Sequence, residues 1–148
     1  MKTNLYTAIA ILAVAGYFNV GSASAQTARP ADLTANIPFE FSISNQTLPA
    51  GEYIVTTVNH VSPNKVLQLR PKKGGSGVMV QTTDAIGRGQ NNPKLVFRHL
   101  GGRYFLAEAW MASGNEGLRF KRSRAEKELE RTLGGTPTIS TVAMYVKR

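Results

Sequence analysis

The sequence predicts an all-β fold, a small antiparallel barrel or sandwich of about eight strands with one short helix near the C-terminus. Three observations support this prediction. Apolar and polar residues alternate with a period of two over several short segments. Glycine and proline stand mainly between these segments. The turns are also short, which favours antiparallel pairing because parallel strands need long crossovers.

The first predicted strand covers residues 32–43. Its apolar positions fall on one face, which we expect to lie in the core: Leu33, Ala35, Ile37, Phe39, Phe41 and Ile43. Pro38 cannot donate to a strand ladder, so this strand is expected at a sheet edge or with a bulge. A turn framed by Pro49 and Gly51 follows, since proline fixes φ and glycine permits positive φ.

Seven further segments carry apolar residues in short runs or alternation and are strand candidates. They are residues 52–61, 65–70, 77–84, 94–100, 103–111, 117–121 and 138–146. Glycine-rich stretches at 74–77 and 87–89 are interpreted as hairpin turns. Because most connections are short, a barrel-like meander is favoured over a sandwich, although the pattern leaves both open.

One short helix is predicted before the last strand. Ser123 and Glu126 have the spacing of a capping box. Ala125, Leu129 and Leu133 follow at intervals of four residues and form a narrow apolar stripe. Glycines 134 and 135 and the proline at 137 end the helix. A helix this short is unstable alone, so we expect it to lean on the sheet.

Residues 1–25 have the features of a cleaved signal peptide. Lys2 precedes an uncharged apolar stretch shorter than the ~20 residues of a spanning helix, and Ala23 and Ala25 form an Ala-x-Ala cleavage site. We therefore expect export to the periplasm or the exterior, with cleavage near Ala25–Gln26. Residues 26–31 would form a flexible leader and residues 32–148 a single β domain. No other segment reaches membrane length, so no transmembrane segment is expected after cleavage.

Composition excludes several kinds of chemistry. The chain has no cysteine, which rules out disulfides, thiolate catalysis and cysteine metal sites. It has only two histidines, His60 and His99, and lacks a Gly-x-Ser-x-Gly elbow. We predict no catalytic residue, no metal site and no cofactor. The leading hypothesis is therefore a non-enzymatic exported domain with a binding or structural role.

Glu108 is the one carboxylate with a candidate chemical role. It alternates with Tyr104, Leu106 and Trp110, which predicts an aromatic face around it. One hypothesis is a hydrolase that pairs Glu108 with a carboxylate from another strand. The alternative is a cross-strand ion pair with an arginine, for which three candidates exist: Arg98, Arg103 and Arg119.

Aromatic residues support a second hypothesis, a carrier with a small apolar ligand inside a barrel. The candidate ligand-binding residues are Tyr53, Phe105, Glu108, Trp110 and Phe120. Strands followed by a short helix and a last strand are similar to lipocalin-like barrels, which hold apolar ligands. The early Gly-x-Trp motif of that family is missing, because Trp110 is the only tryptophan. The alternative is that these side chains simply fill a core, as in most small barrels.

The charge balance is strongly basic, with 18 Lys and Arg against 9 Asp and Glu. Lys2 is the only basic residue in the predicted signal peptide, so a mature chain keeps a net charge of about +8. The candidate anion-binding surface comprises two clusters: Lys72 and Lys73, and Arg119, Lys121, Arg122 and Arg124. Expected partners are anionic envelope or extracellular polymers. Nucleic acid is disfavoured, because the recognition motifs are absent and the chain is predicted to be exported. A merely basic, solubilising surface is the alternative.

Two N-terminal motifs carry a resemblance. They are Ile-Pro-Phe-Glu-Phe at residues 37–41 and Leu-Pro-Ala-Gly-Glu-Tyr at residues 48–53. Together they resemble small exported bacterial proteins of unknown function, which have an Ile-Pro-Phe-Asp/Glu-Phe strand and a Leu-Pro-Ala-Gly-x-Tyr turn. The resemblance implies bacterial export and a small β-rich domain. It implies no activity and no site residues.

Overall fold

The computed structural model describes residues 32–58, 65–90, 92–111 and 114–146. The predicted signal peptide, the leader and His60 lie outside these residues. The described elements are, in chain order, β1 (Leu33–Ile37), β2 (Phe41–Ile43), β3 (Gln46–Leu48), β4 (Gly51–Thr57), β5 (Val66–Pro71), β6 (Val78–Gln90), β7 (Lys94–Leu100), β8 (Arg103–Trp110), β9 (Gly114–Phe120), α2 (Arg124–Leu133) and β10 (Thr138–Val146).

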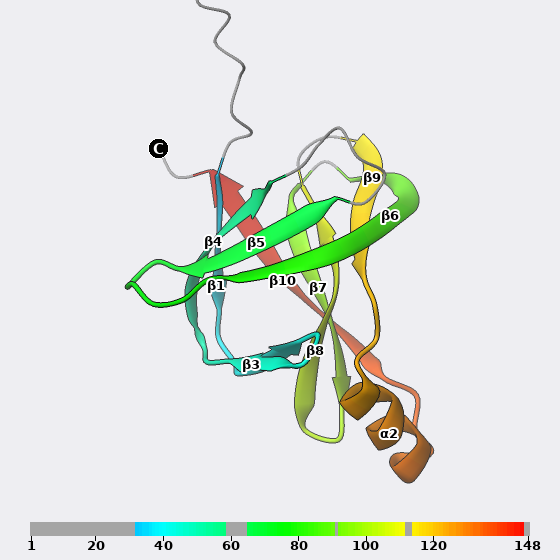
Figure 1. Ribbon diagram of the computed structural model, residues 1–148. Helices are drawn as coiled ribbons and strands as arrows, with labels where there is room; N and C mark the ends of the chain where they lie inside the picture. The colour runs from blue at the N-terminus through cyan, green and yellow to red at the C-terminus, as the bar shows by residue number, and fades with distance from the viewer. Residues whose placement is uncertain (1–31, 59–64, 91, 112–113, 147–148) are drawn as a thin grey trace, which may run out of the picture.

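Eight of these strands form a closed antiparallel barrel (Figure 1). Their order is β8-β7-β10-β1-β4-β5-β6-β9, and β9 returns to pair with β8. The closing pairs place Glu108 opposite Arg119 and Ala109 opposite Leu118. The prediction of an all-β fold with one short helix is confirmed, and the barrel is the correct one of the two architectures.

The strand order is more complex than a single meander. Strands β4, β5 and β6 form one meander, and β7, β8 and β9 form another. Strand β10 lies between β7 and β1 and joins the two meanders. The chain reaches β10 through α2, which lies at one end of the barrel beside the β7–β8 hairpin (Figure 1).

The predicted first strand breaks at Pro38 into β1 and β2. The expectation that it lies at an edge is wrong, because β1 pairs with both β10 and β4. Beyond the break, the Phe39 ring stacks on Tyr104 with centroids 3.7 Å apart. The short β2 then pairs in parallel with β8, with Phe41 opposite Tyr104, and β3 pairs with its other side. Proline therefore marks the point where the chain leaves the barrel wall.

The barrel interior is filled with apolar side chains. Its largest fully buried members are aromatic and aliphatic: Tyr53, Phe41, Phe97, Ile37, Ile43, Leu67, Leu69, Leu95 and Val55. The Phe41 ring meets Tyr53 and Phe97 edge-on, each at 5.5 Å between centroids. The Tyr53 hydroxyl donates to the Pro49 carbonyl oxygen at 2.7 Å. This bond ties the Leu-Pro-Ala-Gly-x-Tyr turn to the core, which explains the spacing of the motif.

A bulge in β8 changes which side chains face outward. Val96 pairs with Glu108 but Phe97 pairs with Leu106, so Ala107 is the extra residue. Leu106 belongs to the core, whereas the Glu108 carboxylate bonds to the exposed Arg119. The expectation that Glu108 shares a face with Tyr104 and Leu106 is therefore wrong.

The second glycine-rich turn is also corrected. Residues 74–77 do form the β5–β6 turn, where Gly74 and Gly75 have φ of 92° and 117°. Residues 87–89 instead lie inside β6, which continues to pair with β9 through a register shift. The reason is steric: a side chain at Gly87 or Gly117 would collide with the Trp110 indole. Gly87 and Gly117 therefore accommodate the tryptophan, and Gly87 does not mark a turn.

The helix has the predicted bounds but only half of the predicted capping box. Ser123 Oγ accepts the Glu126 backbone N–H at 3.1 Å. The Glu126 carboxylate binds the Arg98 guanidinium of β7 instead of returning to the cap. Gly134, with φ of 61°, ends the helix. The Glu126 carboxylate therefore holds the helix against the barrel and does not cap it.

Candidate functional site

The five predicted ligand-binding residues do not share one cavity. Tyr53 and Phe120 belong to the barrel core. Phe105, Glu108 and Trp110 lie outside that core cluster, on the outer side of β8. Two of the five therefore line the interior. Phe105 lies on the face of β8 opposite Leu106, and the bulge at Ala107 turns Glu108 and Trp110 to that same outer face.

Glu108 and Trp110 form a surface cluster with Arg119 of β9. The Trp110 indole N–H donates to Glu108 Oε2 at 3.0 Å, and the Arg119 guanidinium lies 3.2 Å from Oε1. Of the three arginines named as partners, Arg119 is the one found. The indole is only 6% exposed, because it covers the backbone of Gly87 and Gly117. Both carboxylate oxygens are thus occupied by cross-strand and local donors.

A hollow of about 550 Å³ lies beside this cluster; we call it the basic hollow. Seven residues line it: Thr83, Arg98, Glu108, Arg119, Phe120, Lys121 and Arg122. It thus unites three of the predicted anion-binding residues, Arg119, Lys121 and Arg122. Arg98 was not predicted as a member, because its strand β7 is separated from β9 by β8, which pairs with both.

Most cations of the basic hollow already have acidic partners. Arg98 pairs with Glu126, and Arg122 Nη1 lies 2.7 Å from Glu130 Oε2. Lys121 is exposed and has no ion-pair partner among the residues that the structure describes. The surplus positive charge of this hollow therefore resides mainly on Lys121.

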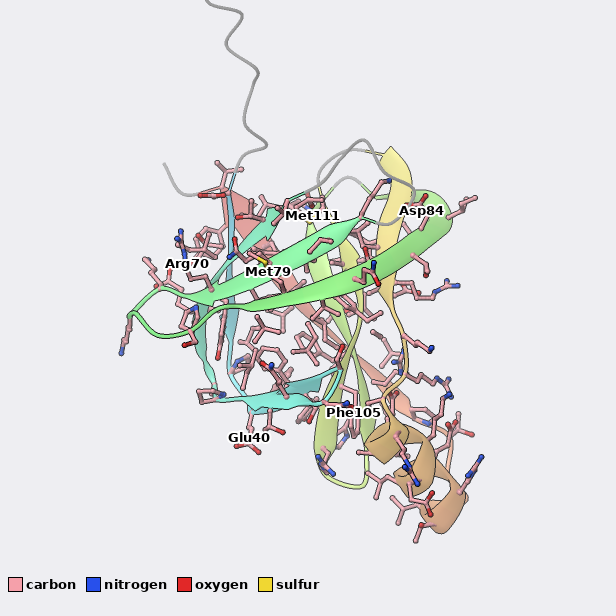
Figure 2. The ribbon with its side chains drawn as sticks, viewed as in Figure 1. Glu40, Arg70, Met79, Asp84, Phe105 and Met111 are labelled. Atoms are coloured by element: carbon pink, nitrogen blue, oxygen red, sulfur yellow. The ribbon has the colours of Figure 1, made fainter. Side chains whose placement is uncertain are left out.

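A second hollow, of about 480 Å³, lies between the β2–β3 hairpin and the start of α2. We call it the hairpin groove. Its lining is polar over a single aromatic ring: Ser42, Ser44, Asn45, Thr47, Arg103, Phe105, Ser123, Arg124, Ala125 and Glu128. Figure 2 shows Phe105 on β8 between the hairpin and the helix. Arg124 lies here and not in the basic hollow, so the two hollows divide the predicted cluster.

The other predicted cations lie elsewhere. Lys72 and Lys73 belong to the β5–β6 turn, which projects from the side of the barrel away from α2 (Figure 1). Lys72 Nζ pairs with Glu52, and the same carboxylate accepts the Tyr145 hydroxyl at 3.2 Å. Lys73 is exposed. The two predicted clusters are therefore separate surfaces.

Carboxylates and cations differ in how fully they are paired. Six carboxylates of the described residues hold a basic side chain: Glu52, Asp84, Glu108, Glu126, Glu128 and Glu130. Several exposed cations have no acidic partner among the residues that the structure describes: Arg70, Lys73, Arg103, Lys121, Arg124 and Lys127. Four of these six stand around the start of α2. The net positive charge is thus concentrated at that end of the barrel.

His99 has a packing role in the structure. Its ring stacks on Tyr104 with centroids 4.3 Å apart, and Tyr104 in turn stacks on Phe39. Across the described ranges, His, Asp and Glu side chains do not gather in groups of three or more that could hold a metal ion. The helix that the structure describes is neither long nor apolar enough to cross a membrane.

Two tyrosines have perturbed titration. Burial raises the pKa of the Tyr53 hydroxyl. Burial and the hydrogen bond to Glu52 raise the pKa of Tyr145. Neither tyrosine lines one of the two hollows. Because both pKa values are raised, the two hydroxyls affect how the free energy of unfolding changes at high pH.

No protein-family model, curated protein or solved structure matches this chain.

Proposed function

We propose that the chain is an exported, non-enzymatic β-barrel domain that binds anionic polymers of the cell envelope or the extracellular medium. The proposed binding surface, here called the basic face, consists of the basic hollow and the hairpin groove. The supporting observation is that one short segment of the chain contributes basic side chains to both hollows. The β9–α2 linker and the first turn of α2 supply Lys121 and Arg122 to one hollow and Arg124 to the other.

The exposed cations without acidic partners would contribute most of the binding. Lys121, Arg103 and Arg124 are exposed and lack ion pairs among the described residues. A polyanion gains their attraction without breaking an existing ion pair. Arg98 and Arg122 already hold carboxylates of α2, so they add less. Because the contacts are at the surface, the affinity should fall as salt screens them.

The contacts of Glu108 favour binding over hydrolysis. A general acid or base needs a carboxylate oxygen within hydrogen-bonding reach of the substrate. Both oxygens of Glu108 accept bonds from Trp110 and Arg119. Glu108 is therefore proposed to order the outer face of β8 and β9.

A carrier function remains the second candidate, supported by the closed eight-stranded barrel. Barrels of this size hold either packed side chains or one small ligand. Native mass spectrometry of protein from the native host separates these cases. A retained mass of a few hundred daltons supports the carrier, and the bare chain mass opposes it.

The polyanion proposal is tested by charge removal at two places. The purified protein is titrated with polygalacturonate and with polyphosphate at low and at moderate salt. Lys121→Gln with Arg124→Gln removes two charges from the basic face. Arg70→Gln with Lys73→Gln is the matched control. These exposed cations also lack ion pairs among the described residues, but they lie at or beside the β5–β6 turn, away from the basic face.

We expect the first double variant to weaken binding about tenfold, since each exposed charge contributes up to about 1 kcal/mol. The control should stay within about twofold. Equal losses in both double variants would show nonspecific attraction to net charge. No binding to either polymer at low salt would overturn the proposal.

A further inference from the structure

The hairpin groove has the size and floor of a small-ligand site. Its volume of about 480 Å³ falls within the usual range of ligand pockets, roughly 300 to 1,000 Å³. Phe105 forms its apolar floor and is 2% exposed. The walls come from separate parts of the chain, the β2–β3 hairpin and α2. A ligand seated there would contact both.

Two guanidinium groups line this groove. The Arg103 guanidinium carbon lies 5.4 Å from the Phe105 ring centre, a cation–π distance that holds it over the floor. Arg124 lies at the start of α2 and is exposed. Neither has an ion pair within the described part of the chain. Arginine's planar fork suits a carboxylate, which it can bind through two parallel hydrogen bonds.

The rest of the groove offers neutral polar groups and one acid. Ser44, Asn45 and Thr47 belong to the hairpin and are exposed. Ser42 Oγ and Thr47 Oγ1 lie 3.3 Å apart, so the wall is internally hydrogen bonded. Across from the hairpin, α2 contributes Glu128, whose closest basic partner, Arg131, is 3.8 Å away.

Glu128 decides between classes of anion. A phosphate group carries up to two negative charges, and a carboxylate in the lining repels it. A singly charged ligand with hydroxyl groups meets less repulsion, and its hydroxyls can donate to Glu128. The hairpin hydroxyls and the Asn45 amide can donate to and accept from such hydroxyls too. The lining therefore fits one carboxylate next to several hydroxyls.

We propose that the hairpin groove binds a single hexuronate unit of an acidic polysaccharide. The carboxylate would meet Arg103 and Arg124, and the ring hydroxyls would meet Asn45 and Glu128. This inference rests on the proposed function and deepens it, because it assigns the class of polymer and one subsite. The basic hollow would hold neighbouring units by charge alone.

The test compares trigalacturonate, its methyl ester and tripolyphosphate by calorimetric titration of the full protein. Asn45→Ala removes an amide from the groove. Gln46→Ala is the matched control, because this neighbouring exposed amide does not line the groove. Thermal unfolding of each variant checks that the fold is kept.

We expect Asn45→Ala to weaken trigalacturonate binding about three- to tenfold, the usual effect of losing one hydrogen bond. Tripolyphosphate binding should be unchanged, and Gln46→Ala should affect neither ligand. The methyl ester should bind at least about tenfold more weakly than trigalacturonate, because it lacks the charge that the arginines recognise.

Two outcomes would overturn the subsite, and they differ in what they imply. If Asn45→Ala and Gln46→Ala bind trigalacturonate equally while Lys121→Gln with Arg124→Gln weakens both anions, the uronate site fails and polyanion binding stands. If the unaltered protein binds neither anion at low salt, the proposed function itself fails.

Discussion

Arg98 of β7 and Glu126 of α2 form an ion pair between barrel and helix, with side chains only 12% and 4% exposed. The contact is bidentate: Nε donates to Oε1, and Nη2 donates to Oε2 at 3.1 Å. Such pairs fix orientation as well as distance. This pair therefore fixes the angle of α2 and, through it, the basic side chains of the β9–α2 linker.

Removing one partner should be costly. Glu126→Ala leaves the Arg98 guanidinium buried without its carboxylate, which lowers the free energy of unfolding by about 3 kcal/mol. Glu128→Ala serves as the control on the same helix, because its side chain is 70% exposed and its ion pair is long. That variant should lose no more than about 0.5 kcal/mol. Urea unfolding of both variants measures the difference, and equal losses would contradict a structural role for the pair.

Trp110 provides a second prediction, because it covers two glycines. A Cβ added at Gly117 would lie 2.7 Å from the indole ring, well inside van der Waals contact. Gly117→Ala should therefore displace the indole and cost about 1–3 kcal/mol. As Trp110 is the only tryptophan, a red shift of its fluorescence reports the displacement directly.

Gly135→Ala is the matched control for that substitution. Nothing lies within 4 Å of a Cβ at Gly135. Its fluorescence should match that of the unaltered protein, and its stability should change by less than about 0.5 kcal/mol. A Gly117→Ala variant with unshifted fluorescence would show that the indole does not pack on this backbone.

Local pattern was enough to predict most elements of this fold. The strands at residues 94–100 and 138–146 and the helix bounds follow from periodicity and capping alone. Each element buries one face, and the apolar residues of that face recur at a regular spacing within the element's own sequence. The short turns between consecutive strands favour a barrel but leave a sandwich open, and closure depends on the pairing of β8 with β9.

The features that could not be predicted from the sequence depend on contacts between residues that are distant in the chain. The bulge at Ala107 exists only relative to β7, and it moves Glu108 to the outer face. Gly87 is explained only once Trp110 is placed on it. Arg98 enters the basic hollow because its strand β7 and strand β9 both pair with β8. Such relations follow from strand order, which local periodicity does not encode.

The predicted signal peptide allows a test outside the described residues. Export with cleavage after Ala25 should give a mature protein that begins at Gln26, which intact mass spectrometry of the native host's extracellular and periplasmic fractions measures. Ala25→Leu should block cleavage, because the −1 position accepts only small residues. Ser24→Leu at the tolerant −2 position is the control. A full-length chain in those fractions, or only in the cytoplasm, would contradict the prediction.

Tyr53 predicts how stability depends on pH. Burial raises the pKa of its hydroxyl above the ordinary value of about 10. The folded protein therefore keeps this proton at a pH where the unfolded chain has lost it. Stability from this group is complete below about pH 10 and is lost as pH rises further toward the folded pKa. The free energy of unfolding should thus fall as the pH rises above about 10.

Tyr53→Phe separates this effect from general alkaline damage. The variant loses the hydrogen bond to the Pro49 carbonyl, which costs about 1 kcal/mol at neutral pH. It should then lose less stability than the unaltered protein over the alkaline range, because it has no buried hydroxyl to ionise. Tyr145→Phe is the comparison: its raised pKa acts in the same direction, but its exposed side chain should have the smaller effect. Urea unfolding at several pH values measures each curve, and identical alkaline slopes for Tyr53→Phe and the unaltered protein would exclude Tyr53 as the titrating group.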